Sequence, residues 1–133
     1  MAAIVLDTDV SSRILRRTLP TPLAGRLSGK DLCVSFVTVG ELWKWAELRA
    51  WGPRSRAELA DFLINVVILS SGEGVARRWG FMTAAAQRRG RTQPANDSWI
   101  AATCVAHGLP LATLNVKDFH DLVDHEGLTL LSS

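Results

Sequence analysis

Short apolar segments alternate with longer amphipathic segments along almost the whole chain. The apolar segments have the length and composition of buried strands and lie at 3–6, 32–38, 65–70, 110–115 and 128–132. Segments with helical periodicity lie between them, at 10–17, 40–51, 55–64, 73–89 and 96–108. This alternation predicts βαβ units, and therefore an α/β fold in which helices cover both faces of a central, mainly parallel sheet of four to five strands.

The length and composition fit a single globular domain spanning residues 1–133. A chain of 133 residues, 47% of them hydrophobic, is long enough to bury a core without disulfides. No apolar run approaches the roughly 18 residues that a membrane-spanning helix needs, and the N-terminus lacks the pattern of a secretion signal. Cys33 and Cys104 lie inside apolar segments, so we expect a protein of the reducing cytoplasm, with no membrane partner.

The formal net charge of +2 does not by itself indicate a protein that binds nucleic acid. Twelve of the fifteen cationic residues are arginines, however, and guanidinium groups suit phosphate oxygens better than ammonium groups do. Arg88, Arg89 and Arg91 stand one loop before the predicted helix at 96–108. They are candidate phosphate contacts, although arginine clusters of this kind are also typical of solvated helix faces.

Carboxylates follow the predicted strands at the ends where parallel sheets bind ligands. Asp7 ends the first strand, Glu41 follows the second, and Asn115 and Asp118 follow the fourth, while Asp97 lies in the first turn of the helix before it. Four acids brought to one sheet edge repel one another unless a cation lies among them. An all-oxygen ligand set favours Mg²⁺ or Mn²⁺, and such ions activate water for the hydrolysis of phosphodiesters.

Each acid also has a purely structural interpretation. Residues 38–41 form a capping-box pattern, in which Glu41 only returns a hydrogen bond to the start of its helix, and residues 115–118 could do the same for a short helix. Asp97 is favoured in a first turn by the helix dipole, and Asp9 could cap the helix that begins at residue 10. The joint placement of the acids at strand ends favours the metal site over these separate explanations.

Four motifs together resemble the PIN-domain ribonucleases, especially the VapC toxins of prokaryotic toxin–antitoxin pairs. The motifs are LDTD at 6–9, TVGEL at 38–42, NDSWIAA at 96–102 and ATLNVKDF at 112–119, and their order and spacing cover essentially the whole chain. The resemblance implies a PIN-like three-layer α/β/α sandwich. It also implies an endoribonuclease dependent on Mg²⁺ or Mn²⁺, acting on single-stranded or loop regions of RNA, often tRNA or rRNA.

The resemblance also assigns roles to individual residues. Asp7, Glu41, Asp97 and Asp118 would be the catalytic, metal-binding acids, with Thr8 holding the site by its hydroxyl and Asn115 a polar neighbour. Asp9 departs from the family, which usually has Asn or Ser at that position. The implied partners are a VapB-type antitoxin, which forms a hetero-oligomer with the toxin, and a second copy of the chain in a homodimer.

Two other functions remain open from the sequence. The strand that ends in Asp7 and Asp9 also resembles the start of the haloacid-dehalogenase phosphatases, in which the first aspartate is the nucleophile. The late acidic pair of that family is missing, and Lys117 is the only plausible lysine. The third candidate is a non-catalytic PIN-like module that binds RNA or a partner protein through its arginines.

Overall fold

The computed structural model describes residues 2–132. The strands are β1 (Ala3–Leu6), β2 (Asp31–Val34), β3 (Val67–Ile68), β4 (Leu111–Ala112) and β5 (Leu130–Leu131). The helices are α1 (Thr8–Arg16), α2 (Thr21–Leu27), α3 (Phe36–Leu48), α4 (Pro53–Asn65), α5 (Glu73–Arg88), α6 (Ala95–His107) and α7 (His120–Glu126), with a 3-10 helix η1 at Val116–Phe119. All four strand pairings are parallel, in the order β3-β2-β1-β4-β5, which confirms the predicted fold class.

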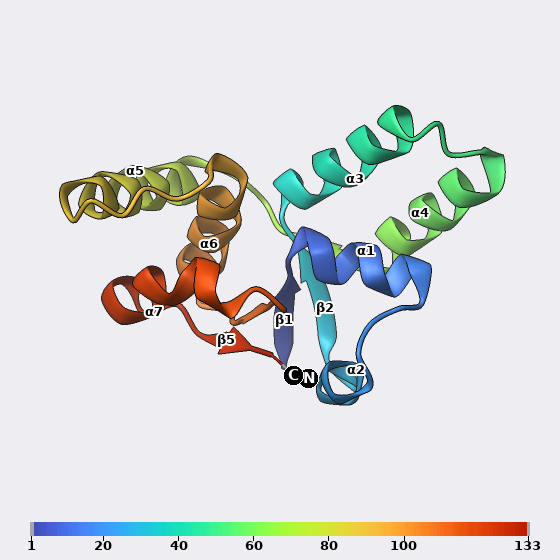
Figure 1. Ribbon diagram of the computed structural model, residues 1–133, viewed down its shortest axis with the longest axis horizontal. Helices are drawn as coiled ribbons and strands as arrows, with labels where there is room; N and C mark the ends of the chain where they lie inside the picture. The colour runs from blue at the N-terminus through green and yellow to red at the C-terminus, as the bar shows by residue number, and fades with distance from the viewer. Residues whose placement is uncertain (1, 133) are drawn as a thin grey trace.

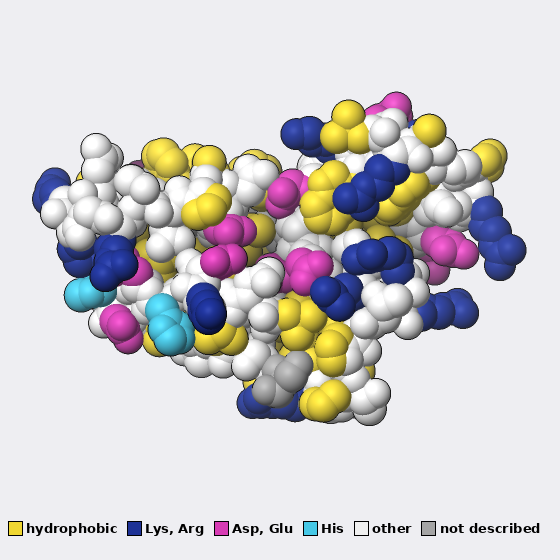
Figure 2. All heavy atoms as spheres, viewed as in Figure 1, with side chains coloured by type: hydrophobic (Ala, Val, Ile, Leu, Met, Phe, Trp, Pro, Cys, Tyr) yellow, Lys and Arg dark blue, Asp and Glu magenta, His cyan; other side chains and the backbone are white. Residues whose placement is uncertain are grey.

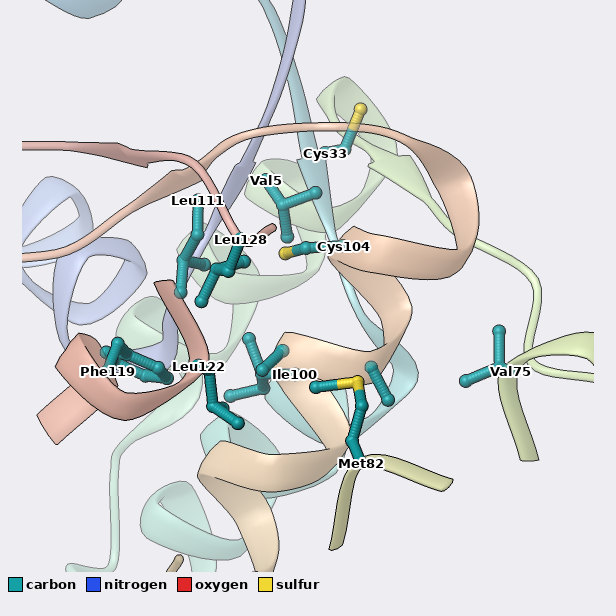
Figure 3. Packing of buried hydrophobic residues seen from close by; sticks show 12 residues of the cluster. Val5, Cys33, Val75, Met82, Ile100, Cys104, Leu111, Phe119, Leu122 and Leu128 are labelled. Carbon is teal, nitrogen blue, oxygen red and sulfur yellow. The ribbon is translucent and has the colours of Figure 1, made fainter. Parts of the chain in front are cut away.

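Alternating side chains of β1 separate the core into two halves, one on each face of the sheet. Ile4 and Leu6 pack with Val10 of α1 and with α2 on one face, whereas Val5 packs with Cys104 of α6 on the other. Figure 3 shows this second half, to which α5, α6 and α7 contribute. Figure 1 shows α1 and α2 on one side of the sheet and α6 and α7 on the other, which is the predicted three-layer arrangement.

The predicted strand at 32–38 is wrong in its second half. Strand β2 ends at Val34, and α3 begins at Phe36 rather than at residue 40. The reason is Ser35, whose Oγ accepts a hydrogen bond from the Thr38 backbone N–H at 3.2 Å and so caps the helix. The residues after Ser35 form the first turn of a helix. Because they are apolar and partly β-branched, the sequence pattern predicts a strand at these positions.

Helix α1 also begins earlier than predicted, at Thr8 instead of residue 10. Its N-cap is Asp7, whose Oδ1 accepts a hydrogen bond from the Val10 backbone N–H at 2.7 Å. Helix α6 matches its predicted range closely and ends as expected at Gly108, which has the left-handed φ of 67° that favours glycine. None of the helices within residues 2–132 is long and apolar enough to cross a membrane.

Candidate metal-binding active site

The four predicted acids come from four segments that meet near the carboxyl ends of β1 and β4. Asp7 directly follows β1, Asp118 lies in η1 after β4, Asp97 lies in the first turn of α6, and Glu41 lies in α3. Figure 2 shows acidic side chains near the middle of the face that it presents, with Lys and Arg side chains on both sides of them. The fold therefore brings the predicted acids to one region of the surface.

Asp7 is the most buried of these acids, with only 5% of its surface exposed. Burial raises the pKa of its carboxyl from 3.8 to about 6, and the charges of Asp9 and Asp97 add to the rise. Interactions with the Thr113 hydroxyl and the Val10 N–H oppose it. The chain thus holds a carboxylate where water solvates it poorly, an arrangement that a bound cation would stabilise.

Asp97 connects the other members of the cluster. Burial raises the pKa of its carboxyl, and the negative charges of Asp118 and Glu41 raise it further. Asp97 is also one of the charges that raise the pKa of Asp7. All four carboxylates therefore interact electrostatically through Asp97.

Glu41 is held in place by two side-chain hydrogen bonds. The Thr8 hydroxyl donates to Oε1 at 2.7 Å, and the Asn96 amide donates to Oε2 at 2.9 Å. The hydroxyls of Thr8 and Thr38 lie 2.9 Å apart, so Thr38 can donate to Thr8 in turn. The capping-box interpretation of Glu41 is therefore wrong, because Ser35 caps α3 and Glu41 reaches across to α1 and α6.

Thr8 is predicted to act as a positioning residue for Glu41. Thr8→Val preserves the shape of the side chain but removes the hydroxyl, and we expect it to lower RNA cleavage about tenfold and the free energy of unfolding by about 1 kcal/mol. Thr8→Ser keeps the hydroxyl and should restore most of the activity. Equal activity of the Val and Ser variants in a cleavage assay would contradict a positioning role.

Asp9 lies beside the cluster but is paired with a cation. Its Oδ2 lies 3.2 Å from Nε of Arg13, one helical turn along α1. The predicted capping role of Asp9 is wrong, because Asp7 caps α1. Asp9 influences the site through its charge, which contributes to the raised pKa of Asp7.

The structure also distinguishes Asp118 from Asn115. The charge of Asp118 acts on Asp97, whereas the Asn115 side chain makes no capping bond at the start of η1. The backbone N–H of Asn115 donates instead to the Thr113 hydroxyl at 3.0 Å. Asp118 is therefore the member of this segment whose charge acts on the cluster, and Asn115 lacks the predicted capping role.

The donor chemistry of the site fits a hard divalent cation. The polar groups of the four acids are carboxylate oxygens, and burial raises the pKa of both thiols, Cys33 and Cys104, so neither is a ready thiolate ligand. Within residues 2–132, no three His, Cys, Asp or Glu side chains are already gathered closely enough to hold one metal ion. The site suits a cation because its four carboxylates repel one another, and a bound positive charge would relieve that repulsion.

The residues that brace the acids were not predicted to belong to the site. They are Ser35, Thr38, Asn96 and Thr113, and each is tied by hydrogen bonds or electrostatic interaction to the cluster or its supports. Thr38 and Asn96 lie inside the motifs that carry the acids. Their polarity next to the acids of these motifs was the available signal, but such residues are equally typical of helix caps.

Comparison with known proteins places this arrangement in a family. The family model of the PIN domain matches residues 4–124. Ribonuclease VapC2 of Haemophilus influenzae is 31% identical over 126 residues, which cover 92% of this chain and 94% of that protein.

Solved structures agree with the sequence comparison. VapBC-1 from nontypeable Haemophilus influenzae has a chain that superposes with a TM-score of 0.82 at 26% identity, covering 98% of this chain and 97% of that one. VapBC-5 from Mycobacterium tuberculosis, a member of the VapBC family of toxin–antitoxin systems, gives a TM-score of 0.74 at 27% identity over the full length of both chains. The chain belongs to the PIN-domain family and, within it, to the group that includes the VapC ribonucleases.

Proposed function

We propose that the protein is an endoribonuclease dependent on Mg²⁺ or Mn²⁺ and the toxin of a type II toxin–antitoxin pair. The observation that carries this proposal is the electrostatic interaction of Asp7, Glu41 and Asp118 with Asp97, which contributes to the raised pKa values of Asp7 and Asp97. The likeness to ribonuclease VapC2 supports RNA as the substrate. The reaction would be hydrolysis of an RNA phosphodiester bond, with tRNA and rRNA as the first substrates to test.

Asp7 and Asp97 would be the principal ligands of the metal, and Glu41 and Asp118 would complete the site. When bound, Mg²⁺ or Mn²⁺ supplies positive charge that lowers the pKa of water and stabilises the reacting phosphate. Asp7 is suited to its role because the cap bond from Val10 fixes one carboxylate oxygen. Thr8 and Asn96 each hold one oxygen of Glu41. The Glu41 carboxylate is therefore already positioned to orient a water molecule.

A VapB-type antitoxin is the proposed protein partner, together with a second copy of the chain. The structural relatives from Haemophilus and Mycobacterium are VapBC toxin–antitoxin proteins, which supports the antitoxin as a partner. The described surface also exposes large apolar side chains on neighbouring helices, namely Phe36, Trp43, Leu48 and Ile64. Exposed apolar groups of this kind are typical of surfaces that partner proteins cover.

The two alternative functions are not favoured. A phosphatase nucleophile at Asp7 needs the late acidic pair of that family, which this chain lacks, and one oxygen of Asp7 is engaged in capping α1. A non-catalytic module has no need for four acids in electrostatic contact. The family match and the relatives described above are PIN-domain proteins and ribonucleases.

Incubation of the purified protein with labelled tRNA and rRNA tests the proposed function. We expect discrete cleavage products in Mg²⁺ or Mn²⁺, none in EDTA, and recovery of cleavage when the metal is restored. Undiminished cleavage in EDTA, or release of phosphate from a phosphate monoester without RNA cleavage, would contradict the proposal.

A further inference from the structure

A polar cavity of about 700 Å³ is lined in part by Asp118 and by none of the other three acids of the cluster. Its walls are the loop between α5 and α6 on one side and η1 with α7 on the other. The cationic side chains in its lining are Arg89, Arg91 and Lys117. Arg89 and Arg91 come from the segment that follows α5, and Lys117 comes from η1, so two separate segments bring cations to one space.

The charges around this cavity leave two cations available for a ligand. Arg89 is bonded through Nε and Nη2 to the two carboxylate oxygens of Asp121, at 3.2 and 2.6 Å, and so is already neutralised. Within residues 2–132, neither Arg91 nor Lys117 forms an ion pair.

The other ionisable groups in the lining are Asp118, Asp124, His120 and His125. Asp118 belongs to the acidic cluster, and His125 lies 3.7 Å from Asp121. The lining therefore holds three cations and three carboxylates. Asp118 is one of the proposed metal ligands, so a bound cation would compensate its charge and leave Arg91 and Lys117 opposed only by Asp124, a balance that suits a phosphodiester backbone.

A second cavity of about 250 Å³ adjoins the first and shares Thr92 and Gln93 with it. Its lining is mostly apolar and includes Met82 and Leu122, while Gln87 and Gln93 supply amide groups. A mostly apolar cavity with a few polar groups at its edge is the usual form of a small-molecule site, and a nucleobase is a group of that kind. Amide side chains can both donate to and accept from the edge of a base.

Trp79 gives this smaller cavity a rigid wall. Its ring stacks on Trp99 at 4.4 Å between centroids with an interplanar angle of 4°, and its Nε1 donates to the Ser98 hydroxyl at 2.8 Å. Ser98 is the residue after Asp97, so the aromatic wall is tied directly to the acidic cluster. A base held against this wall would therefore sit at a fixed position relative to the reacting phosphate.

We propose that the two cavities together bind one nucleotide of the RNA strand, on the Asp118 side of the bond that is cut. Arg91 and Lys117 contact the phosphate in the larger cavity, and Gln87 and Gln93 read the edge of the base in the smaller one. This inference rests on the proposed function, because it describes how the same site selects its RNA. Gln87 and Gln93 would then determine which base is preferred beside the cleaved bond.

The phosphate half of the proposal is tested with a matched pair of arginines. Arg88 ends α5 three residues before Arg91 but does not line the cavity. RNA binding is measured by fluorescence anisotropy on the non-cleaving Asp97→Asn background over a range of salt concentrations. We expect Arg91→Ala and Lys117→Ala each to weaken binding several-fold at low salt and to reduce the salt slope by about 0.7, whereas Arg88→Ala leaves both unchanged.

The base half is tested by sequencing cleavage products from a randomised RNA pool. We expect Gln87→Ala and Gln93→Ala to change the base preference at one position beside the cut by about fivefold or more, while cleavage of an optimal RNA persists. Asn65→Ala, an exposed amide on α4, serves as the control. Both glutamines are at or near the surface, so these variants are expected to fold.

The outcomes separate the subsite from the proposed function. An unchanged base preference in both glutamine variants, or equal effects of Arg88→Ala and Arg91→Ala on the salt slope, would overturn the subsite while leaving cleavage intact. Absence of metal-dependent cleavage by the wild-type protein would instead overturn the proposed function, and with it the subsite.

Discussion

Asp97→Asn is expected to lower RNA cleavage by at least about 100-fold while leaving the fold intact. The substitution keeps the size of the side chain but removes the charge through which Asp7, Glu41 and Asp118 interact. Loss of a direct metal ligand should cost more than the 10–100-fold typical of the residues that support such ligands. The measurement is the rate of product formation under saturating Mg²⁺ or Mn²⁺.

Asp61→Asn is the matched control for this experiment, because Asp61 is an exposed acid on α4, outside the acidic cluster. It should retain full activity, and circular dichroism should show the same helix content for both variants. A cleavage rate for Asp97→Asn within a few-fold of the Asp61→Asn rate would mean that Asp97 does not hold the metal.

Asp7→Asn is expected to stabilise the metal-free protein at neutral pH. The pKa of Asp7 is about 6 in the folded protein and 3.8 ordinarily, so ionisation of Asp7 opposes folding. The penalty is absent below pH 3.8, grows as the pH rises, and is complete above pH 6, where it reaches up to about 3 kcal/mol. Asparagine removes this penalty and remains a good N-cap for α1.

Urea denaturation in EDTA measures this effect. At pH 7.5 the free energy of unfolding should be higher for Asp7→Asn than for the wild type, and the difference should shrink as the pH falls toward 4. Asp7→Ala should gain less, because it also loses the cap bond from Val10, worth about 1 kcal/mol. An Asp7→Asn variant less stable than the wild type at pH 7.5 would show that Asp7 acts mainly as a structural carboxylate.

The fold class could be predicted because strand and helix periodicity determine it. Ile4, Val5 and Leu6 alternate between two faces of a sheet that is buried on both sides, so the first strand is a continuous apolar run. The boundaries were harder to predict. Ser35 ends β2 and caps α3 with one hydroxyl, and the apolar residues that follow it fit a strand or a helix equally well.

The acids of the site could be predicted from their places after strands, but their local roles could not. Asp7 proved to be both the strand-end acid and the cap of α1, two roles that the sequence had divided between Asp7 and Asp9. The bonds that hold Glu41 come from Thr8 and Asn96, which are 33 and 55 residues away in sequence. Contacts between such distant positions depend on how helices pack, which one sequence does not specify.

The two cavities near Asp118 also could not be predicted from the sequence. Arg88, Arg89 and Arg91 appeared as equivalent candidates for phosphate contacts. The packing of α7 against α5 then gives them different surroundings, with Arg89 bonded to Asp121 and Arg91 lining the cavity. A cluster of arginines in the sequence therefore indicates roughly where a phosphate could bind. The tertiary structure determines which of the arginines can contact it.

The central claim is that the acidic cluster binds the divalent metal, and a calorimetric titration of Mn²⁺ into RNA-free protein tests it most directly. We predict saturable binding by the wild type and by Asp61→Asn, and loss of that binding in Asp97→Asn. Equal Mn²⁺ binding by the wild type and Asp97→Asn would contradict the claim.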